Sequence, residues 1–138
     1  MPQNRQSQSF RDICTRYARL SAENRQLDED LAYLRHKLGA LAAEEHRQPL
    51  LVQKTEQRLG QLLSRSSLVW NELVETETLL RRAAACLPQP RMTRILLYRY
   101  LEQLPWSQIS EITGLEPRWL YRLHRRALAL LDARQRSA

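Results

Sequence analysis

A heptad repeat of apolar residues, which begins at Phe10, is the feature that most constrains the fold of this chain. Apolar side chains recur at alternating steps of three and four residues, a pattern typical of a helix that packs along one side against another helix. With Phe10 at position a, the polar Asn24 interrupts the repeat at a later a position. The repeat predicts a helical seam formed by Leu20, Asn24, Leu27, Leu31, Leu34, Leu38 and Leu41.

A second, looser seam runs from Val52 to Leu87, and Pro49 separates it from the first. A proline inside a continuous helix removes a backbone hydrogen bond and clashes with the preceding turn, at a cost of about 3 kcal/mol. We therefore expect a break near Pro49 and a helical arm over residues 10–87. The arm is an antiparallel hairpin, which we favour, or a long kinked coiled coil, because no Gly, Asn or Asp marks a tight turn at the break.

Asn24 leaves two interpretations open. A buried Asn at an a position pairs best with its own copy and would favour a parallel dimer. The flanking charges do not decide, because in such a dimer Asp30 would meet Arg35 favourably while Glu23 would meet Asp28 with like charge. We favour the simpler interpretation, a polar residue at a solvated position of a hairpin.

The composition predicts an all-α protein, because the chain has only three glycines and its six prolines are confined to a few places. Two prolines within residues 87–90 end the arm. We expect residues 1–9 to be disordered and residues 134–138 to form a tail. The sequence has no apolar run of 18 residues and no signal peptide, so we expect a cytoplasmic protein without a membrane span.

The sequence offers little for catalysis or metal binding. Cys14 and Cys86 lie far apart in helical patterns, and we expect reduced thiols. The three histidines have no metal-ligand spacing among themselves or with the cysteines, and neither a nucleophile motif nor a glycine-rich phosphate loop occurs. We therefore predict that the protein is not an enzyme and that it needs no metal or cofactor.

The residues after the arm predict a compact module of three helices over residues 91–133. The first helix covers residues 91–103 and the second covers residues 107–113, with Ile109 and Ile112 facing the core. Gly114 is suited to end the second helix in a left-handed conformation, and a proline then begins a third helix over residues 117–132.

Positive charge gathers in this module. Residues 1–90 carry 13 basic and 11 acidic side chains, whereas residues 91–138 carry 9 and 4. On a helical projection of residues 117–132, an apolar face opposes a face of arginines without an acidic neighbour. The apolar face is Leu120, Leu123, Ala127 and Leu131, and the basic face is Arg118, Arg122, Arg125 and Arg126. Two short helices with a glycine turn and a basic second helix are typical of a helix-turn-helix that enters the DNA major groove.

The stretches LPWSQISEITGL (residues 104–115) and YRLHRRAL (residues 121–128) resemble region 4 of sigma-70 factors. They are more similar still to small phage regulators of the RinA and ArpU type, in which a two-helix arm precedes such a module. The resemblance is specific over residues 91–132 and only architectural before them. It implies binding to double-stranded DNA near a promoter and contact with host RNA polymerase.

Carried onto this sequence, the resemblance implies base readout by Arg118 and Arg122, with Arg125 as a less secure third candidate. It implies contact with the DNA backbone or polymerase for a second set, which comprises Arg126, Tyr121, Trp119, Ser107 and Gln108. Sigma factors usually carry an acidic residue and a later Gln at the base-reading positions. Arginine at both positions points instead to guanine.

For three aromatic side chains we also consider a role in packing. Trp106 is expected in the core of the module, and His124 is expected to pack or to form a hydrogen bond. Trp119 either packs on the preceding helix or lies against the sugar-phosphate backbone.

The sequence thus favours a sequence-specific transcription regulator that acts as a homo-oligomer, with a dimer preferred. Two alternatives remain: a DNA-packaging protein similar to a small terminase subunit, and a polymerase-binding adaptor without DNA affinity. The order of parts argues against a terminase subunit, because those proteins generally place the DNA-binding module first.

Overall fold

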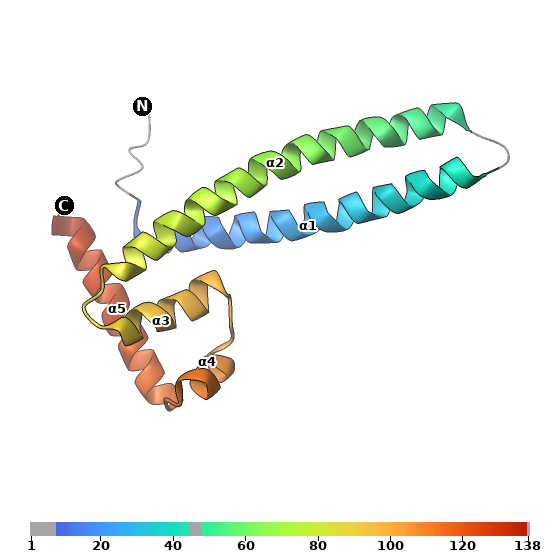
Figure 1. Ribbon diagram of the computed structural model, residues 1–138. Helices are drawn as coiled ribbons and strands as arrows, with labels where there is room; N and C mark the ends of the chain where they lie inside the picture. Colours follow the sequence, from blue (N-terminus) through green and yellow to red (C-terminus); the bar gives the residue numbers. More distant parts are fainter. Residues whose placement is uncertain (1–7, 45–47, 138) are drawn as a thin grey trace. The chain divides into compact units, whose positions relative to one another are not determined.

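A computed structural model describes residues 8–44 and 48–137, and these residues are helical throughout apart from short connections. No strand occurs among them, which confirms the predicted all-α fold class. None of the described helices is long and apolar enough to cross a bilayer. In chain order (Figure 1), the elements are α1 (Phe10–Ala43), α2 (Pro49–Ala85), α3 (Pro90–Leu96), the π-helical segment η2 (Leu97–Leu101), α4 (Trp106–Thr113) and α5 (Pro117–Ser137).

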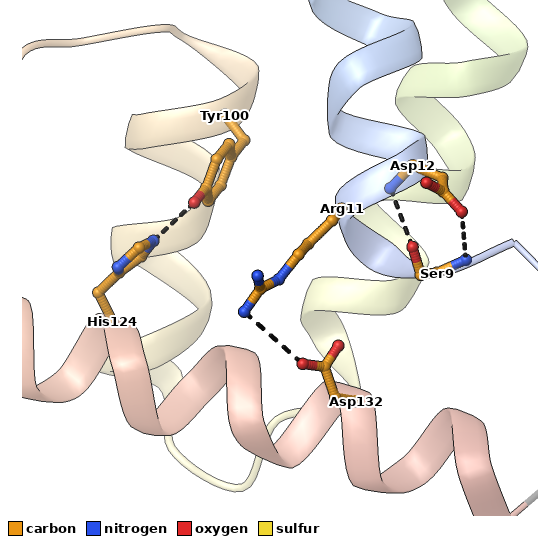
Figure 2. Close-up of polar contacts among 6 residues, drawn as sticks. All are labelled: Ser9, Arg11, Asp12, Tyr100, His124 and Asp132. Atoms are coloured by element: carbon orange, nitrogen blue, oxygen red, sulfur yellow. Dashed lines mark hydrogen bonds and ion pairs between the residues drawn. The ribbon is translucent and has the colours of Figure 1, made fainter.

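Helix α1 begins at Phe10 because Ser9 and Asp12 form a reciprocal cap (Figure 2). The backbone N–H of Asp12 donates to Ser9 Oγ over 3.1 Å, and the backbone N–H of Ser9 donates to Asp12 Oδ2 over 3.4 Å. Such a pair satisfies N–H groups that lack an intrahelical acceptor. Residues 1–7 of the segment predicted to be disordered lie outside the described residues, whereas its last residue, Ser9, has this defined role.

The break between the two long helices falls where the sequence placed it. Helix α1 ends at Ala43 and α2 begins at Pro49, with residues 45–47 outside the described part of the chain. Pro49 occupies the first helical position, where its missing N–H would have no partner in the helix.

The chain forms two compact units, and the division falls within α1 and within α2. In the unit of residues 19–74, the two helical segments lie side by side and run in opposite directions (Figure 1). The Arg65 guanidinium pairs with Glu23 Oε1 across them at 2.6 Å. This unit is an antiparallel hairpin.

The predicted seam lies along this hairpin. Leu20, Leu27, Leu31 and Leu41 are buried, whereas Asn24, Leu34 and Leu38 are half-buried. On α2, Thr55 is buried and its hydroxyl donates to the carbonyl of Leu51 over 2.7 Å, so this buried hydroxyl is hydrogen-bonded.

The other unit contains described residues 8–18 and 75–137. Its larger cluster, which we call the base cluster, joins the start of α1 and the end of α2 to α3 and α5. The buried members of the base cluster are Phe10, Ile13, Cys14, Leu80, Ala84, Leu87, Met92, Leu96, Ala127 and Leu131. A smaller cluster, the turn cluster, consists of Ile95, Ile109 and Leu120, which are all fully buried.

The connection between α2 and α3 follows the sequence closely, since α2 ends at Ala85 and α3 starts at Pro90. Thr93 Oγ1 donates to the carbonyl of Ala84 over 2.8 Å and joins the two helix ends. The first helix of the module was predicted as a single helix over residues 91–103. Instead, α3 passes into a π-helical segment that ends at Leu101.

The path from η2 to α4 is held by local hydrogen bonds. The N–H of Leu104 donates to the carbonyl of Tyr98 over 3.0 Å, and the Arg99 guanidinium donates to the carbonyl of Leu104 over 3.0 Å. Between them, Gln103 has a φ of 57°, a left-handed conformation that is unfavourable for a residue with a Cβ.

Helices α4 and α5 are separated by residues 114–116, as predicted. Gly114 has a φ of 71°, and its N–H donates to the carbonyl of Ser110 over 2.9 Å. Helix α5 continues to Ser137, beyond the expected end near residue 132 and through most of the expected tail.

One core prediction for α4 is wrong. Ile109 is fully buried, but Ile112 is 49% exposed. Leu115, in the connection between α4 and α5, packs against the turn cluster. The apolar contact expected of Ile112 is thus made by a residue outside the helix.

Candidate nucleic-acid interface

The basic face predicted for the last helix is present on α5. Its four arginines are exposed, while Leu120, Ala127 and Leu131 are buried on the opposite side. None of the four forms an ion pair with any residue that the structure describes. These arginines, which we call the basic face, are Arg118, Arg122, Arg125 and Arg126.

An exposed face of arginines is electrostatically unfavourable on its own, because like charges at helical spacings of three and four residues repel each other. Nearby polyanions would remove this repulsion. The basic face therefore has the charge and the accessibility that a duplex backbone and the base edges of its major groove require.

Arg122 is the one member of the basic face with a described contact to an aromatic ring. Its guanidinium carbon lies 4.9 Å from the centroid of the Trp119 ring. Trp119 is 46% exposed, so this pair lies at the surface. Stacking leaves the in-plane N–H donors of a guanidinium free, and these donors are the groups that recognise guanine O6 and N7.

A group of aromatic side chains joins α5 to Trp106. The Trp106 ring meets the rings of Tyr121 and His124 edge-on, with centroids 5.3 and 4.7 Å away. The Arg99 guanidinium carbon lies 4.8 Å from the centroid of the Trp106 ring on another side. Trp106 is half-buried and packs on the turn cluster, in agreement with the core position predicted for it.

His124 forms the hydrogen bond that the sequence led us to expect. Its Nε2 lies 2.6 Å from the hydroxyl of Tyr100 (Figure 2). Burial lowers the pKa of His124, and the positive charges of Arg99 and Arg11 lower it further. Burial, together with Cys14, raises the pKa of Tyr100 against the opposing effect of Arg99 and Arg11. The neutral forms of both side chains are therefore favoured. The direction of their hydrogen bond follows the tautomer of His124, because a neutral imidazole carries its proton on either Nδ1 or Nε2.

A further link supports α5 near its end. The Arg11 guanidinium pairs with Asp132 at 3.7 Å (Figure 2), although both side chains are substantially exposed. Surface ion pairs of this kind contribute little to stability. Cys14, on the same helix as Arg11, is buried, and burial raises the pKa of its thiol to about 12, so it is not a nucleophile at neutral pH.

The remaining predicted contacts lie at two places. Tyr121, a member of the aromatic group on α5, is 46% exposed, while Ser107 and Gln108 are exposed in the first turn of α4. The seven seam residues belong to the unit of residues 19–74, and the basic face belongs to the other unit.

Sequence reasoning missed a pocket of about 200 Å³ between α3, η2 and α4. The sequence contained one sign of this pocket, because Arg91 and Arg94 stand three residues apart on one helix. The pocket depended, however, on the exposure of Ile112, which the helical pattern had assigned to the core. Its lining residues are Arg91, Arg94, Tyr98, Ile112 and Thr113.

Within the described residues, no group of three or more His, Cys, Asp and Glu side chains is placed to hold a metal ion. Comparisons with protein-family models, curated proteins and solved structures gave no match, so the resemblance to sigma region 4 stays a prediction from the sequence.

Proposed function

We propose that this protein is a sequence-specific DNA-binding regulator of transcription, of the phage type that its sequence resembles, and that α5 enters the major groove. The observation that carries the proposal is the basic face: four exposed arginines without described ionic partners, on the side of α5 opposite its buried residues. DNA-binding helices of this kind present one face to the groove and pack the other on the module.

The arrangement of α4 and α5 supports the same proposal. A short helix, a connection of three residues that starts with a left-handed glycine, and a longer basic helix follow one another. In a helix-turn-helix protein, the second helix reads bases while the first crosses the sugar-phosphate backbone. Ser107 and Gln108, exposed at the start of α4, are suited to hydrogen bonds with phosphate oxygens.

Base readout is assigned to Arg118 and Arg122, with Arg125 as a third candidate. Arginine recognises guanine through two parallel hydrogen bonds, which discriminate against another base by about 1–3 kcal/mol. Arg126, Tyr121 and Trp119 are proposed to contact the DNA backbone or RNA polymerase. A regulator of this kind acts in the compartment of the DNA, which we propose to be the cytoplasm.

The experiment begins with the selection of binding sites from random duplexes by the full-length protein. Arg122→Ala is then expected to weaken binding to the selected site by about tenfold or more, and binding to random duplex much less. Arg134→Ala is the matched control, because Arg134 is exposed on the same helix but outside the basic face. Equal losses on the two duplexes for Arg122→Ala would remove Arg122 from base readout.

Salt dependence separates the proposal from its alternatives. The logarithm of the binding constant should fall with the logarithm of salt concentration by about 0.9 per phosphate neutralised. If no duplex binds even at low salt, an adaptor without DNA affinity takes the place of the regulator. A ring of many subunits in native mass spectrometry would instead favour the packaging protein.

A further inference from the structure

We propose that the pocket between α3, η2 and α4 binds an acidic, aliphatic segment of a partner protein, with a carboxylate held by Arg91 and Arg94 and an aliphatic side chain placed against Ile112. This inference goes beyond DNA binding and does not depend on it. No residue of α5 lines the pocket, so its occupation and the use of the basic face are separable.

The charge of the pocket points to an anion. Two of its five lining residues are exposed arginines, and none is acidic. Neither Arg91 nor Arg94 forms an ion pair within the described part of the chain. Two guanidinium groups that line one pocket offer charge-assisted hydrogen bonds to a carboxylate, which are stronger than those between neutral groups.

The other polar groups of the pocket further restrict the chemistry of the ligand. The Thr113 hydroxyl donates to the carbonyl of Ile109 over 2.7 Å and accepts the N–H of Leu115 over 3.3 Å. It is therefore engaged in ending α4. The guanidinium groups, which are donors, and the Tyr98 hydroxyl remain for a ligand, and donors of this kind match the oxygens of an acid.

Ile112 favours a protein segment over a phosphodiester. Its side chain is 49% exposed at the pocket, although it stands in a helix whose other isoleucine, Ile109, is fully buried. Covering this side chain with an aliphatic group removes apolar surface from water, which stabilises a complex. An Asp or Glu next to a Leu or Ile in a partner supplies both the charge and the apolar group, whereas a phosphate supplies the charge alone.

The size of the pocket agrees with a peptide side chain. Its volume of about 200 Å³ is below the range of roughly 300–1,000 Å³ that is typical of small-molecule sites. One or two side chains of a segment that continues across the surface would fill it. A partner of this chemistry would contact the module without occupying the basic face.

The test is a titration of the full-length, 15N-labelled protein, followed by the backbone amide signals of Arg94, Tyr98, Ile112 and Thr113. The probe is the capped dipeptide acetyl-Leu-Glu-amide. Acetyl-Leu-Gln-amide lacks the charge, acetyl-Ala-Glu-amide lacks the larger aliphatic group, and dimethyl phosphate represents the DNA backbone. We expect saturable shifts with the first probe and affinities lower by about tenfold or more with Leu-Gln.

Substitutions of pocket residues test whether the Leu-Glu probe binds in the pocket. Arg94→Gln and Ile112→Ser should each weaken binding of the Leu-Glu probe, while Arg134→Gln, with the same loss of charge outside the pocket, should not. The side chains of Arg94 and Ile112 are both exposed, so neither substitution should disturb the fold. Unchanged amide signals away from the pocket are expected to show that each variant is folded.

Three outcomes would overturn the proposal. These are no saturable shift with the Leu-Glu probe, equal affinity for the Leu-Gln probe, and affinity for dimethyl phosphate that equals or exceeds that for Leu-Glu. The last outcome would make the pocket a phosphate site. Loss of DNA binding in Arg122→Ala is independent of all three results, so failure of this proposal is distinguishable from failure of the proposed function.

Discussion

His124 shows how a single residue connects the module to its surroundings. It stands on α5, its Nε2 meets the Tyr100 hydroxyl from η2, and its ring meets Trp106 from α4. The imidazole of His124 therefore contacts side chains of two other elements, η2 and α4. A positive charge on His124 is disfavoured by its burial and by the charges of Arg99 and Arg11.

The stability of the protein should therefore depend on pH through His124. Its pKa is lowered by burial and by the charges of Arg99 and Arg11. The unfolded chain, with a histidine pKa near 6.5, takes up this proton first as the pH falls. Stability is fully present above about pH 6.5 and is lost as the pH falls through the folded pKa.

Urea unfolding at several pH values between 7.5 and 5, followed by tryptophan fluorescence, measures this loss. His124→Gln should have a smaller decrease in the free energy of unfolding than the unsubstituted protein. His36→Gln, at an exposed position of α1, should retain the full decrease. An unchanged decrease in His124→Gln would show that other groups cause it.

Trp119 and Arg122 form the second pair that matters at the residue scale. If the tryptophan ring orients the guanidinium for base readout, Trp119→Ala should weaken binding to the selected site by about two- to fivefold, corresponding to the 0.5–1 kcal/mol of an exposed cation–π contact. The loss should be smaller than that of Arg122→Ala, and fluorescence anisotropy with labelled duplex measures both.

A double variant identifies the coupling. In the Arg122→Ala background, Trp119→Ala should have little further effect, because the side chain that it orients is absent. Additive losses in the double variant would mean that Trp119 contacts the DNA by itself.

At the scale of elements, Gly114 determines how α4 gives way to α5. Its φ of 71° is a conformation that L side chains rarely adopt. Gly114→Ala is therefore expected to destabilise the protein by about 1–2 kcal/mol, as measured by urea unfolding.

Gly60 provides the matched control in α2. It lies in a helix interior, and a Cβ added to it would meet no atom within 4 Å. Gly60→Ala should stabilise the protein by up to about 1 kcal/mol. If both substitutions acted in the same direction, backbone conformation would not be the cause.

Prolines and glycines made most helix boundaries predictable. Pro49, Pro90, Gly114 and Pro117 mark ends and beginnings that the structure also has, because each residue restricts or permits particular backbone angles regardless of its tertiary surroundings. The π-helical segment after Leu96 was not predictable, since its residues are ordinary helix formers. Nor was the exposure of Ile112, because the pattern along α4 does not show which residues outside the helix, such as Leu115, pack on the turn cluster.

At the scale of the whole molecule, we propose that the protein binds DNA as a dimer, because one recognition helix gives modest affinity and two tethered modules give more. The seam leucines pack within the hairpin of residues 19–74 in a single chain. The heptad repeat is thus used inside the chain, and dimerisation needs surface beyond this seam.

Sedimentation of the protein with a duplex that carries the selected site tests this proposal. Two chains per duplex are expected. A single chain per duplex, together with a monomer in the absence of DNA, would contradict the dimer.

The sequence by itself determined the all-α class, the break near Pro49, the turn at Gly114 and the two faces of α5. These features follow from backbone restrictions and from helical periodicity, both of which act locally. Only the tertiary structure decided that the start of α1 and the end of α2 share a cluster with α3 and α5, and that the exposed Ile112 lines a pocket together with Arg91 and Arg94. Those outcomes depend on which distant side chains fill the same space, and the pattern along one helix cannot specify its neighbours.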